Sequence, residues 1–349
     1  MKDRYFFWIA SEFHYIISKS IIIDRGINSQ DVYYVCQPGR YINIGTDENI
    51  CNLYDGRNTG FISRFLYYLY NKKEVNLFFE GVRIHIFSPF RGTFPIFDFF
   101  EECSFMEEGL GAYVIEEKKT SKKDVLKEMF RYLGVNLLLC FSSRNIKGYV
   151  MGIGFSGRFP KRLAKIACCS PYVYPKINST KFVRQVFDLR KVPCYLKYNL
   201  PEKAFVIVLD RFCSKGRVYS IENYRLCVEK EIEYLKNKQI NSVWLKLHPA
   251  DDNSKDAFLF FKEIFESNGI IVECFTGILE YLALQDTQTT FIGTNSTILY
   301  YAPLLGKTNR SISFFAPLAE KDELYNKFID RFGGTSVFRD MFSKNVLCI

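Results

Sequence analysis

The sequence has 349 residues, 48% of them hydrophobic and 24% charged, and this composition excludes a disordered or fibrous protein. Its length predicts two domains with a core that needs no disulfide or metal. The 11 cysteines lack metal-ligand spacing and there are only 3 histidines, so we expect free thiols, a reducing compartment and no metal site. No apolar run is long enough for a signal peptide or a membrane-spanning helix. We therefore expect a cytoplasmic protein, with peripheral contact to the inner face of the cell membrane as an additional expectation.

The formal net charge of +9 is concentrated in one segment, residues 144–187, which contains no acidic residue. Its basic residues are Arg144, Lys147, Arg158, Lys161, Arg162, Lys165, Lys176, Lys181 and Arg184. Such a segment favours an anionic partner, namely nucleic acid, an acidic glycan or a membrane surface. A generic solvated face is the alternative.

Strand-like and helix-like segments alternate along the chain. In the first half we expect strands at 5–10, 32–37, 75–79, 83–87, 104–107, 113–115, 135–141 and 149–153, and helices after Ser11 and over 121–133. Residues 188–202 predict a connector, because Pro193 and Pro201 exclude a continuous helix. In the second half we expect strands at 204–209, 242–247, 270–274, 289–292 and 311–315, and helices over 222–238, 255–267, 277–284, 298–305 and 323–332.

This alternation predicts the α/β class, with two facing Rossmann-like domains over residues 1–195 and 196–349. We expect the last segment, 323–349, to be helical and to pack back on the first domain. Ligands of parallel α/β sheets bind at the carboxyl ends of the strands, so we expect the site in a cleft between the domains.

Two adjacent carboxylates, Glu107 and Glu108, stand at the end of a predicted strand and before Gly109. Adjacent strand residues point to opposite faces, so at most one of the two faces the cleft. A partly desolvated carboxylate has the raised pKa that a general base needs, and glycine lets a substrate approach closely. A plain turn with two solvated acids is the alternative.

A cationic pair, Lys246 and His248, ends another predicted strand and shares one face of it, because the two residues are two positions apart. Such a pair suits a phosphate oxygen, and Pro249 stops the strand. The alternative is a strand-end histidine in ordinary hydrogen bonds.

A hydroxyl-rich turn with Thr294, Ser296 and Thr297 connects a predicted strand to a helix. Hydroxyls and N–H groups at a helix N-terminus can hold a phosphate without a metal, and an ordinary N-cap is the alternative. Glu280 lies in the first turn of another predicted helix, where a carboxylate either complements the helix dipole or accepts hydrogen bonds from two ribose hydroxyls.

No two aspartates are separated by a single residue, so the metal-chelating DxD of many sugar-nucleotide transferases is missing. An acid in the first domain is followed by phosphate-binding and ribose-binding groups in the second. This layout predicts a metal-free transferase that acts on a nucleotide-activated, acidic sugar.

These residues resemble the shared motifs of bacterial sialyltransferases of the two-domain GT-B type, which include capsule polysialyltransferases and lipooligosaccharide sialyltransferases. That group has an acidic-acidic-glycine motif, a His-Pro motif and a paired Ser/Thr motif. They stand here as Glu107-Glu108-Gly109, His248-Pro249 and Ser296-Thr297. The second hydroxyl is threonine rather than the commoner serine, which adds a methyl group beside the expected phosphate.

The resemblance implies an inverting, metal-independent transfer of sialic acid from CMP-sialic acid to a hydroxyl of a cell-surface glycan, without a cofactor. Glu108, or Glu107 in its place, would deprotonate the acceptor hydroxyl. His248 would protonate or hydrogen-bond the departing CMP phosphate, and Glu280 would hold the ribose. The other residues expected at the donor are Lys246, Pro249, Thr294, Ser296 and Thr297.

For the acceptor we expect an acidic or galactose-terminated glycan of the capsule or lipooligosaccharide, with residues 144–187 facing it or the inner membrane, and no nucleic acid. The residues expected to bind it are Ser11, His14, Gly109 and Arg158. Two alternatives stay open. One is another metal-free GT-B transferase with a CDP- or UDP-activated donor, and the other is a non-catalytic protein that binds an anionic polymer.

Overall fold

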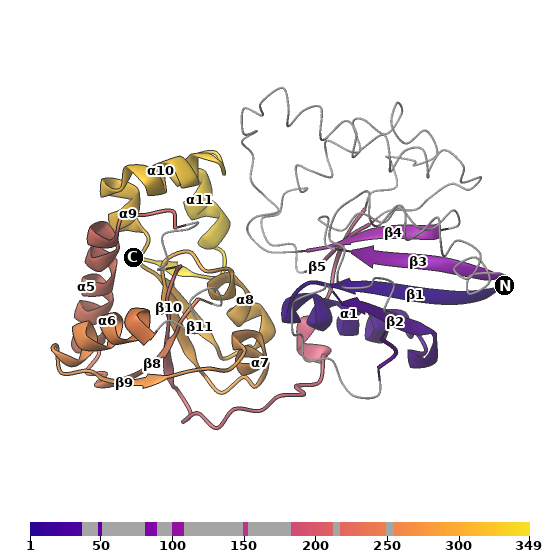
Figure 1. The fold of residues 1–349 in the computed structure, drawn as a ribbon, viewed down its shortest axis with the longest axis horizontal. Helices are drawn as coiled ribbons and strands as arrows, with labels where there is room; N and C mark the ends of the chain where they lie inside the picture. The colour runs from indigo at the N-terminus through magenta and orange to yellow at the C-terminus, as the bar shows by residue number, and fades with distance from the viewer. Residues whose placement is uncertain are drawn as a thin grey trace. The chain divides into compact units, whose positions relative to one another are not determined.

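The computed structural model describes residues 1–36, 48–50, 81–88, 100–107, 149–152, 183–211, 217–248 and 255–349 (Figure 1). The chain divides into two compact units, and the division between Val192 and Pro193 falls inside the predicted connector. Each unit has a parallel sheet of its own, so the predicted α/β class is confirmed.

The sheet of the first unit has the strand order β2-β1-β3-β4-β5-β6, and its neighbouring strands are parallel. Its strands are β1 (Lys2–Ile9), β2 (Val32–Cys36), β3 (Val82–Ser88), β4 (Phe100–Met106), β5 (Tyr149–Gly152) and β6 (Val183–Val186). Its described helices are α1 (Glu12–Arg25) and the 3-10 turns η1 (Ser29–Asp31) and η4 (Leu189–Lys191).

Strand β1 is a central strand of this sheet, and its continuous apolar run reflects that place. Phe6, Phe7 and Ile9 are buried between β2 and β3. The predicted N-cap Ser11 is confirmed, since its side chain accepts a hydrogen bond from the backbone N–H of His14 at the start of α1. The chain therefore leaves the carboxyl end of β1 directly into a capped helix.

The sheet of the second unit has the strand order β12-β11-β10-β7-β8-β9, and its neighbouring strands are also parallel. Its strands are β7 (Phe205–Val208), β8 (Ser242–Lys246), β9 (Ile271–Cys274), β10 (Thr290–Gly293), β11 (Arg310–Ser313) and β12 (Leu347–Cys348). Its helices are α5 (Ile221–Asn237), α6 (Lys255–Glu266), α7 (Leu279–Leu284), α8 (Thr297–Leu305), α9 (Ala316–Lys321), α10 (Glu323–Asp330) and α11 (Thr335–Phe342).

Helices α5 and α6 cover one face of this sheet, and α7 and α8 cover the other (Figure 1). Strand β7 lies between β10 and β8, with Ile207 in register with Ile292 on one side and Leu245 on the other. The carboxyl ends of these three strands therefore meet at one edge of the sheet. The segments that follow them, from residues 209, 247 and 294, start side by side.

The C-terminal segment differs from the prediction. Residues 323–349 do not form one helix but α10, α11 and the short strand β12, which extends the second sheet beside β11. Gly333 and Gly334 separate the two helices with φ values of 101° and 92°, a conformation that side chains rarely adopt. The segment belongs to the second unit.

Several expected elements lie outside the described residues. They are the strands at 75–79, 113–115 and 135–141, the helix over 121–133 and most of the basic segment 144–187. In the part of the chain that is described, no helix combines the length and the apolar character needed to cross a membrane.

Candidate active site

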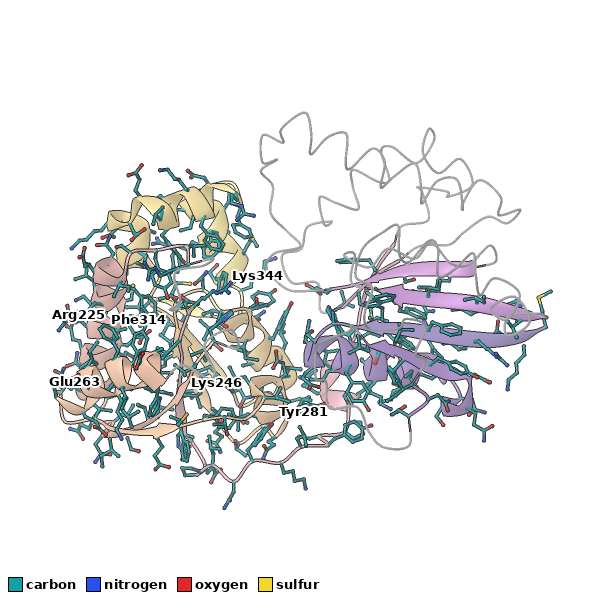
Figure 2. The ribbon with its side chains drawn as sticks, viewed as in Figure 1. Arg225, Lys246, Glu263, Tyr281, Phe314 and Lys344 are labelled. Atoms are coloured by element: carbon teal, nitrogen blue, oxygen red, sulfur yellow. The ribbon has the colours of Figure 1, made fainter. Side chains whose placement is uncertain are left out.

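Predicted donor residues of the second unit gather at the edge where β10, β7 and β8 end. Lys246 is the last residue of β8 (Figure 2), and His248 follows it, half-buried. The Lys246 backbone carbonyl accepts a hydrogen bond from Leu209 N–H at 3.0 Å, which continues the pairing of β7 with β8. Strand β8 ends at Lys246, so His248 lies beyond the strand. The predicted shared strand face of Lys246 and His248 is therefore not formed.

Lys246 also interacts with Glu280, another predicted donor residue. Lys246 is only 7% exposed, and Glu280 is half-buried in the first turn of α7. Burial raises the pKa of the Glu280 carboxyl, while a hydrogen bond from its own backbone N–H and the positive charge of Lys246 act in the opposite direction. The fold thus brings the charge of Lys246 close enough to act on a carboxylate that comes from a different element and is 34 positions later in the sequence.

Helix α7, which carries Glu280, is held at both ends by Tyr198 from the segment that precedes β7. The Tyr198 hydroxyl accepts a hydrogen bond from Ile278 N–H at 2.8 Å, just before the helix. At the other end, the Gln285 side chain accepts from Tyr198 N–H at 2.8 Å and donates to its carbonyl at 3.0 Å. A Cβ at Gly277 would overlap the Tyr198 ring, so this turn requires glycine.

A cavity of about 410 Å³ lies beside the start of α7. Its lining residues are Tyr198, Asn199, Leu200, Trp244, Cys274, Phe275, Thr276, Gly277 and Ile278. The cavity combines aromatic rings with amide and hydroxyl groups, and its volume is within the range of small-molecule sites.

The turn between β10 and α8 contains the predicted hydroxyl cluster. Thr294 is fully buried, and its carbonyl accepts a hydrogen bond from the Ser313 hydroxyl of β11. Ser296 is the N-cap of α8, yet its side chain makes no capping hydrogen bond within the described residues. In α1, α5 and α10 the N-cap side chain does accept a bond from the helix. The start of α8 therefore retains N–H groups for another acceptor.

Asp210 is a residue of this edge that the sequence analysis missed. It follows β7 and is 9% exposed, and it contacts Asn295 in the turn before α8. Burial raises the pKa of the Asp210 carboxyl to about 7, and a hydrogen bond from the Asn295 backbone N–H only partly offsets this. A polar residue directly after an apolar strand was the available signal.

In the first unit, Glu107 follows β4 and is 1% exposed. Its N–H donates to the Met151 carbonyl at 2.8 Å, and a Cβ at Gly152 would overlap its side chain. Glu107 is therefore packed against β5 inside the unit. Four of the predicted site residues lie outside the described residues, namely Glu108, Gly109, Arg158 and Pro249.

Ser11 and His14 form a local hydrogen-bonded unit after β1. The Ala10 N–H donates to Nδ1 of His14 at 3.2 Å, and the Ser11 hydroxyl lies 3.1 Å from the same nitrogen. A backbone N–H can only donate, so Nδ1 is unprotonated and the neutral ring carries its proton on Nε2. His14 is 1% exposed, and its place as a capping partner of Ser11 accounts for these contacts.

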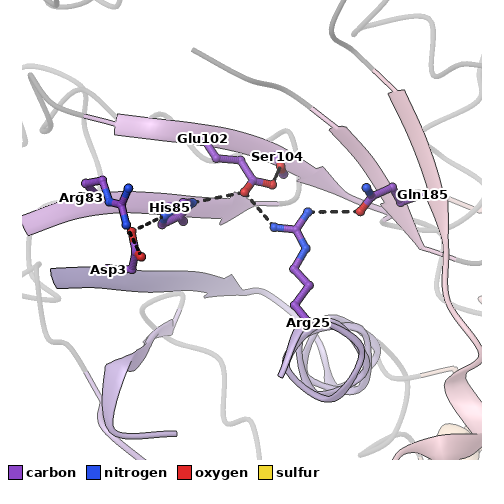
Figure 3. A network of polar contacts seen from close by, with 7 residues as sticks. All are labelled: Asp3, Arg25, Arg83, His85, Glu102, Ser104 and Gln185. Carbon is purple, nitrogen blue, oxygen red and sulfur yellow. Dashed lines mark hydrogen bonds and ion pairs between the residues drawn. The ribbon is translucent and has the colours of Figure 1, made fainter. Parts of the chain in front are cut away.

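A second polar cluster of the first unit crosses its sheet (Figure 3). His85 Nε2 lies 3.0 Å from Asp3, and its Nδ1 lies 3.3 Å from Glu102, which also pairs with Arg25 at 2.8 Å. Burial lowers the pKa of His85, but its hydrogen bonds to Glu102 and Asp3 outweigh this and raise the pKa above its usual value. The further members are Arg83, Ser104 and Gln185.

Parallel α/β sheets with polar groups at a carboxyl edge are typical of nucleotide-binding enzymes. The chain matches the alpha-2,8-polysialyltransferase (POLYST) family over residues 59–313, which is more than half of its length, and it belongs to that family. It is therefore a glycosyltransferase of the sialyltransferase class, and the resemblance found in the sequence is confirmed.

No curated protein matches the chain. Among solved structures, it is similar to the 2,6-sialyltransferase of Vibrionaceae Photobacterium sp. JT-ISH-224 with CMP and lactose, at 12% identity over 99% of this chain and 78% of that one, with a TM-score of 0.48. A sialyltransferase from Photobacterium damsela has 13% identity over 100% and 81%, with a TM-score of 0.48. The UDP-GlcNAc 2-epimerase of Methanocaldococcus jannaschii has 13% identity over 95% and 87%, with a TM-score of 0.42. These TM-scores are below 0.5, so the assignment rests on the family match.

Proposed function

We propose that the protein transfers sialic acid from CMP-sialic acid to a hydroxyl of a cell-surface glycan, with inversion at the anomeric carbon and without a metal ion. The observation that carries this proposal is the carboxyl edge of the second sheet. There His248 and the start of α8 follow β8 and β10, which lie on either side of β7, and the positive charge of Lys246 acts on the carboxylate of Glu280.

The donor phosphate is proposed to bind between His248 and the start of α8. Ser296, Thr297 and the first N–H groups of α8 supply hydrogen-bond donors, and the helix dipole favours an anion there. CMP carries one phosphate, so fixed donors can stabilise the leaving group without a divalent cation. His248 would protonate or hydrogen-bond the phosphate oxygen as the bond to the sugar breaks.

The nucleoside is proposed to bind on the other side of His248. Glu280 would accept hydrogen bonds from the ribose hydroxyls, and Lys246 favours the ionised carboxylate that this requires. The cavity lined by Tyr198, Trp244 and Phe275 lies beside the same helix and has a volume that suits a pyrimidine ring. Tyr198 would then contribute to binding both the base and the ribose. Its ring lines the cavity, and its hydrogen bonds hold α7, which carries Glu280, in place.

The general base is proposed to be Glu108. The burial of Glu107 against Gly152 supports this choice, because a base must reach the acceptor hydroxyl. We propose a GT-B arrangement with the acceptor side in the first domain, where Ser11, His14, Gly109 and Arg158 are the candidates. The acid-free segment 144–187 favours an anionic acceptor or an anionic membrane surface on the cytoplasmic side. The family description favours an α2,8 linkage to a sialylated acceptor.

The proposal is tested by incubating the full chain with CMP-sialic acid and a panel of lactose, sialyllactose and oligosialic acid, with and without EDTA. We expect a mass increase of one or more sialic acid residues in both conditions, with NMR of the product showing an inverted anomeric carbon. Product only with added metal would overturn metal independence. Stabilisation by UDP or CDP but not by CMP in a thermal-shift assay would favour the alternative donors over CMP-sialic acid.

A further inference from the structure

We propose that Asp210 is a positioning residue for the donor phosphate: it holds Asn295 and thereby fixes the turn that leads into Ser296 and Thr297. This inference rests on the proposed function, because it assigns Asp210 to the phosphate side of that site. Asp210 itself need not contact the donor.

Asp210 is fixed by its own strand and by α5. Leu209 N–H continues the pairing of β7 with the Lys246 carbonyl at 3.0 Å, and Asp210 N–H donates to the Tyr224 hydroxyl at 3.0 Å. Tyr219, stacked on Tyr224 at 4.3 Å, donates its hydroxyl to the Arg211 carbonyl at 2.7 Å. The backbone around the carboxylate is therefore bonded to β8, to α5 and to the segment just before α5.

The carboxylate reaches across to the next strand end. With the Asn295 side-chain nitrogen facing Asp210, the orientation that satisfies both groups, this nitrogen lies 3.1 Å from Oδ1 and 2.6 Å from Oδ2. It also donates to Thr294 Oγ1 at 3.1 Å. Ser313 binds the Thr294 carbonyl from the other neighbouring strand. The turn is thus held from β7 on one side and from β11 on the other.

This anchoring has a consequence at the next residue. Ser296 is the N-cap of α8, but its side chain makes no capping bond within the described residues, so the turn lacks the usual local restraint. Asp210 supplies that restraint from outside the helix. The Ser296 hydroxyl and the first N–H groups of α8 can then face a phosphate in a preorganised position.

The surroundings of Asp210 are poor in compensating charge. Its charge acts on Tyr224, Cys227 and the buried carboxyl of Glu231 from α5, and on Tyr325 from α10, and none of these groups is a cation. Protonation of Asp210 therefore accompanies the arrival of a nearby anion, and CMP should bind more tightly as the pH falls through about 7.

The test compares the binding of CMP with that of cytidine, which has the same base and ribose but no phosphate, by isothermal titration calorimetry. We expect Asp210→Ala to weaken CMP about tenfold or more, as for a lost bond to a charged group, and to change cytidine less than about twofold. Asp210→Asn retains an acceptor oxygen, so an intermediate loss is expected. The Asp210→Asn variant should also take up fewer protons than the unaltered chain when it binds CMP at pH 7. Titrations in buffers of different ionisation enthalpy measure this uptake.

Asn295→Ala removes the same contact from the other side and keeps the test open if Asp210→Ala does not fold. It should produce the same selective loss, and the double variant should lose little more than either single one. The control is Asp286→Asn. In the unaltered chain the Asp286 carboxylate accepts a hydrogen bond from Thr308 N–H at 2.7 Å, before β10 and β11 begin and so away from their carboxyl ends. This variant should leave both affinities unchanged.

An unchanged ratio of CMP to cytidine affinity in the Asp210 and Asn295 variants would overturn the inference. This holds if neither affinity changes, and also if both fall equally, because equal losses would indicate a general effect on the fold. If the unaltered chain bound neither compound, the proposed function would fail instead.

Discussion

A buried carboxyl group on α5 gives a pH-dependent prediction about stability. Glu231 is 1% exposed, and within the described residues its Oε2 has no hydrogen-bond partner. Burial raises the pKa of this carboxyl to about 8, and the charge of Asp210 adds to the effect. Replacing it with glutamine keeps the shape of the side chain and removes the titrating proton.

The sign follows from proton binding. Between pH 4.5, the ordinary value for glutamate, and about 8, the folded chain keeps a proton on Glu231 that the unfolded chain has released. The free energy of unfolding therefore falls as the pH rises through this range, by roughly 4–5 kcal/mol in total at about 1.36 kcal/mol per unit. In Glu231→Gln, the buried glutamine amide without partners lowers the free energy of unfolding by about 1–3 kcal/mol at every pH, relative to the protonated glutamate.

The two effects predict that the stability curves of Glu231→Gln and of the unaltered chain cross as the pH rises. Glu231→Gln should be less stable than the unaltered chain at pH 5, by about 1 kcal/mol, and more stable at pH 8.5, by roughly 3 kcal/mol. Urea unfolding followed by fluorescence measures this, because Trp244 lies in the second unit and the other tryptophan, Trp8, lies in the first.

The matched control is Glu233→Gln, an exposed glutamate of the same helix that pairs with Lys230 at 2.8 Å. Its unfolding free energy should stay within about 0.5 kcal/mol of the unaltered chain at every pH. If the difference between Glu231→Gln and the unaltered chain does not change with pH, Glu231 is not held protonated by burial and the reasoning fails.

Three further predictions concern the first unit, the helix of the proposed ribose contact, and the proposed base. The stability that His85 contributes is full below about pH 6.5 and is lost as the pH rises through its raised pKa. His85→Gln should therefore remove this fall in the free energy of unfolding, and an unchanged dependence of that free energy on pH would contradict the prediction. Tyr198→Phe removes the acceptor for Ile278 N–H and should weaken CMP several-fold, on the order of 1 kcal/mol, with little effect on dCMP; equal losses would argue against a ribose contact through this helix. Glu108→Gln should lower kcat at least about 100-fold with an unchanged melting temperature, whereas Glu107→Gln should mainly lower the melting temperature; the reverse pattern would move the base to Glu107.

The sequence predicted most of the described sheet core, because central parallel strands are continuous apolar runs. The strand expected at 5–10 is β1, and the one expected at 204–209 is β7. The strands β6 and β12 were not predicted, since Arg184 and Gln185 interrupt the apolar residues of β6 and β12 has only two residues. The helix expected at 323–332 is α10, which ends before Gly333 and Gly334, whereas the expectation of helix over all of 323–349 overlooked these glycines.

The candidate site was predictable only in part. Lys246, His248 and the turn before α8 stand at strand ends, which the alternation of elements locates. Their meeting at one edge depends on β7 lying between β8 and β10, and strand order does not follow from local patterns. Asp210 was missed for the same reason, because its importance comes from Asn295, a residue that is distant in the sequence.

The most direct test of the central claim measures CMP release from CMP-sialic acid in EDTA with a sialylated acceptor, for the unaltered chain and for His248→Ala. We expect steady turnover by the unaltered chain and a loss of about 100-fold or more in the variant at the same melting temperature. No turnover by the unaltered chain, or full turnover by the variant, would contradict it.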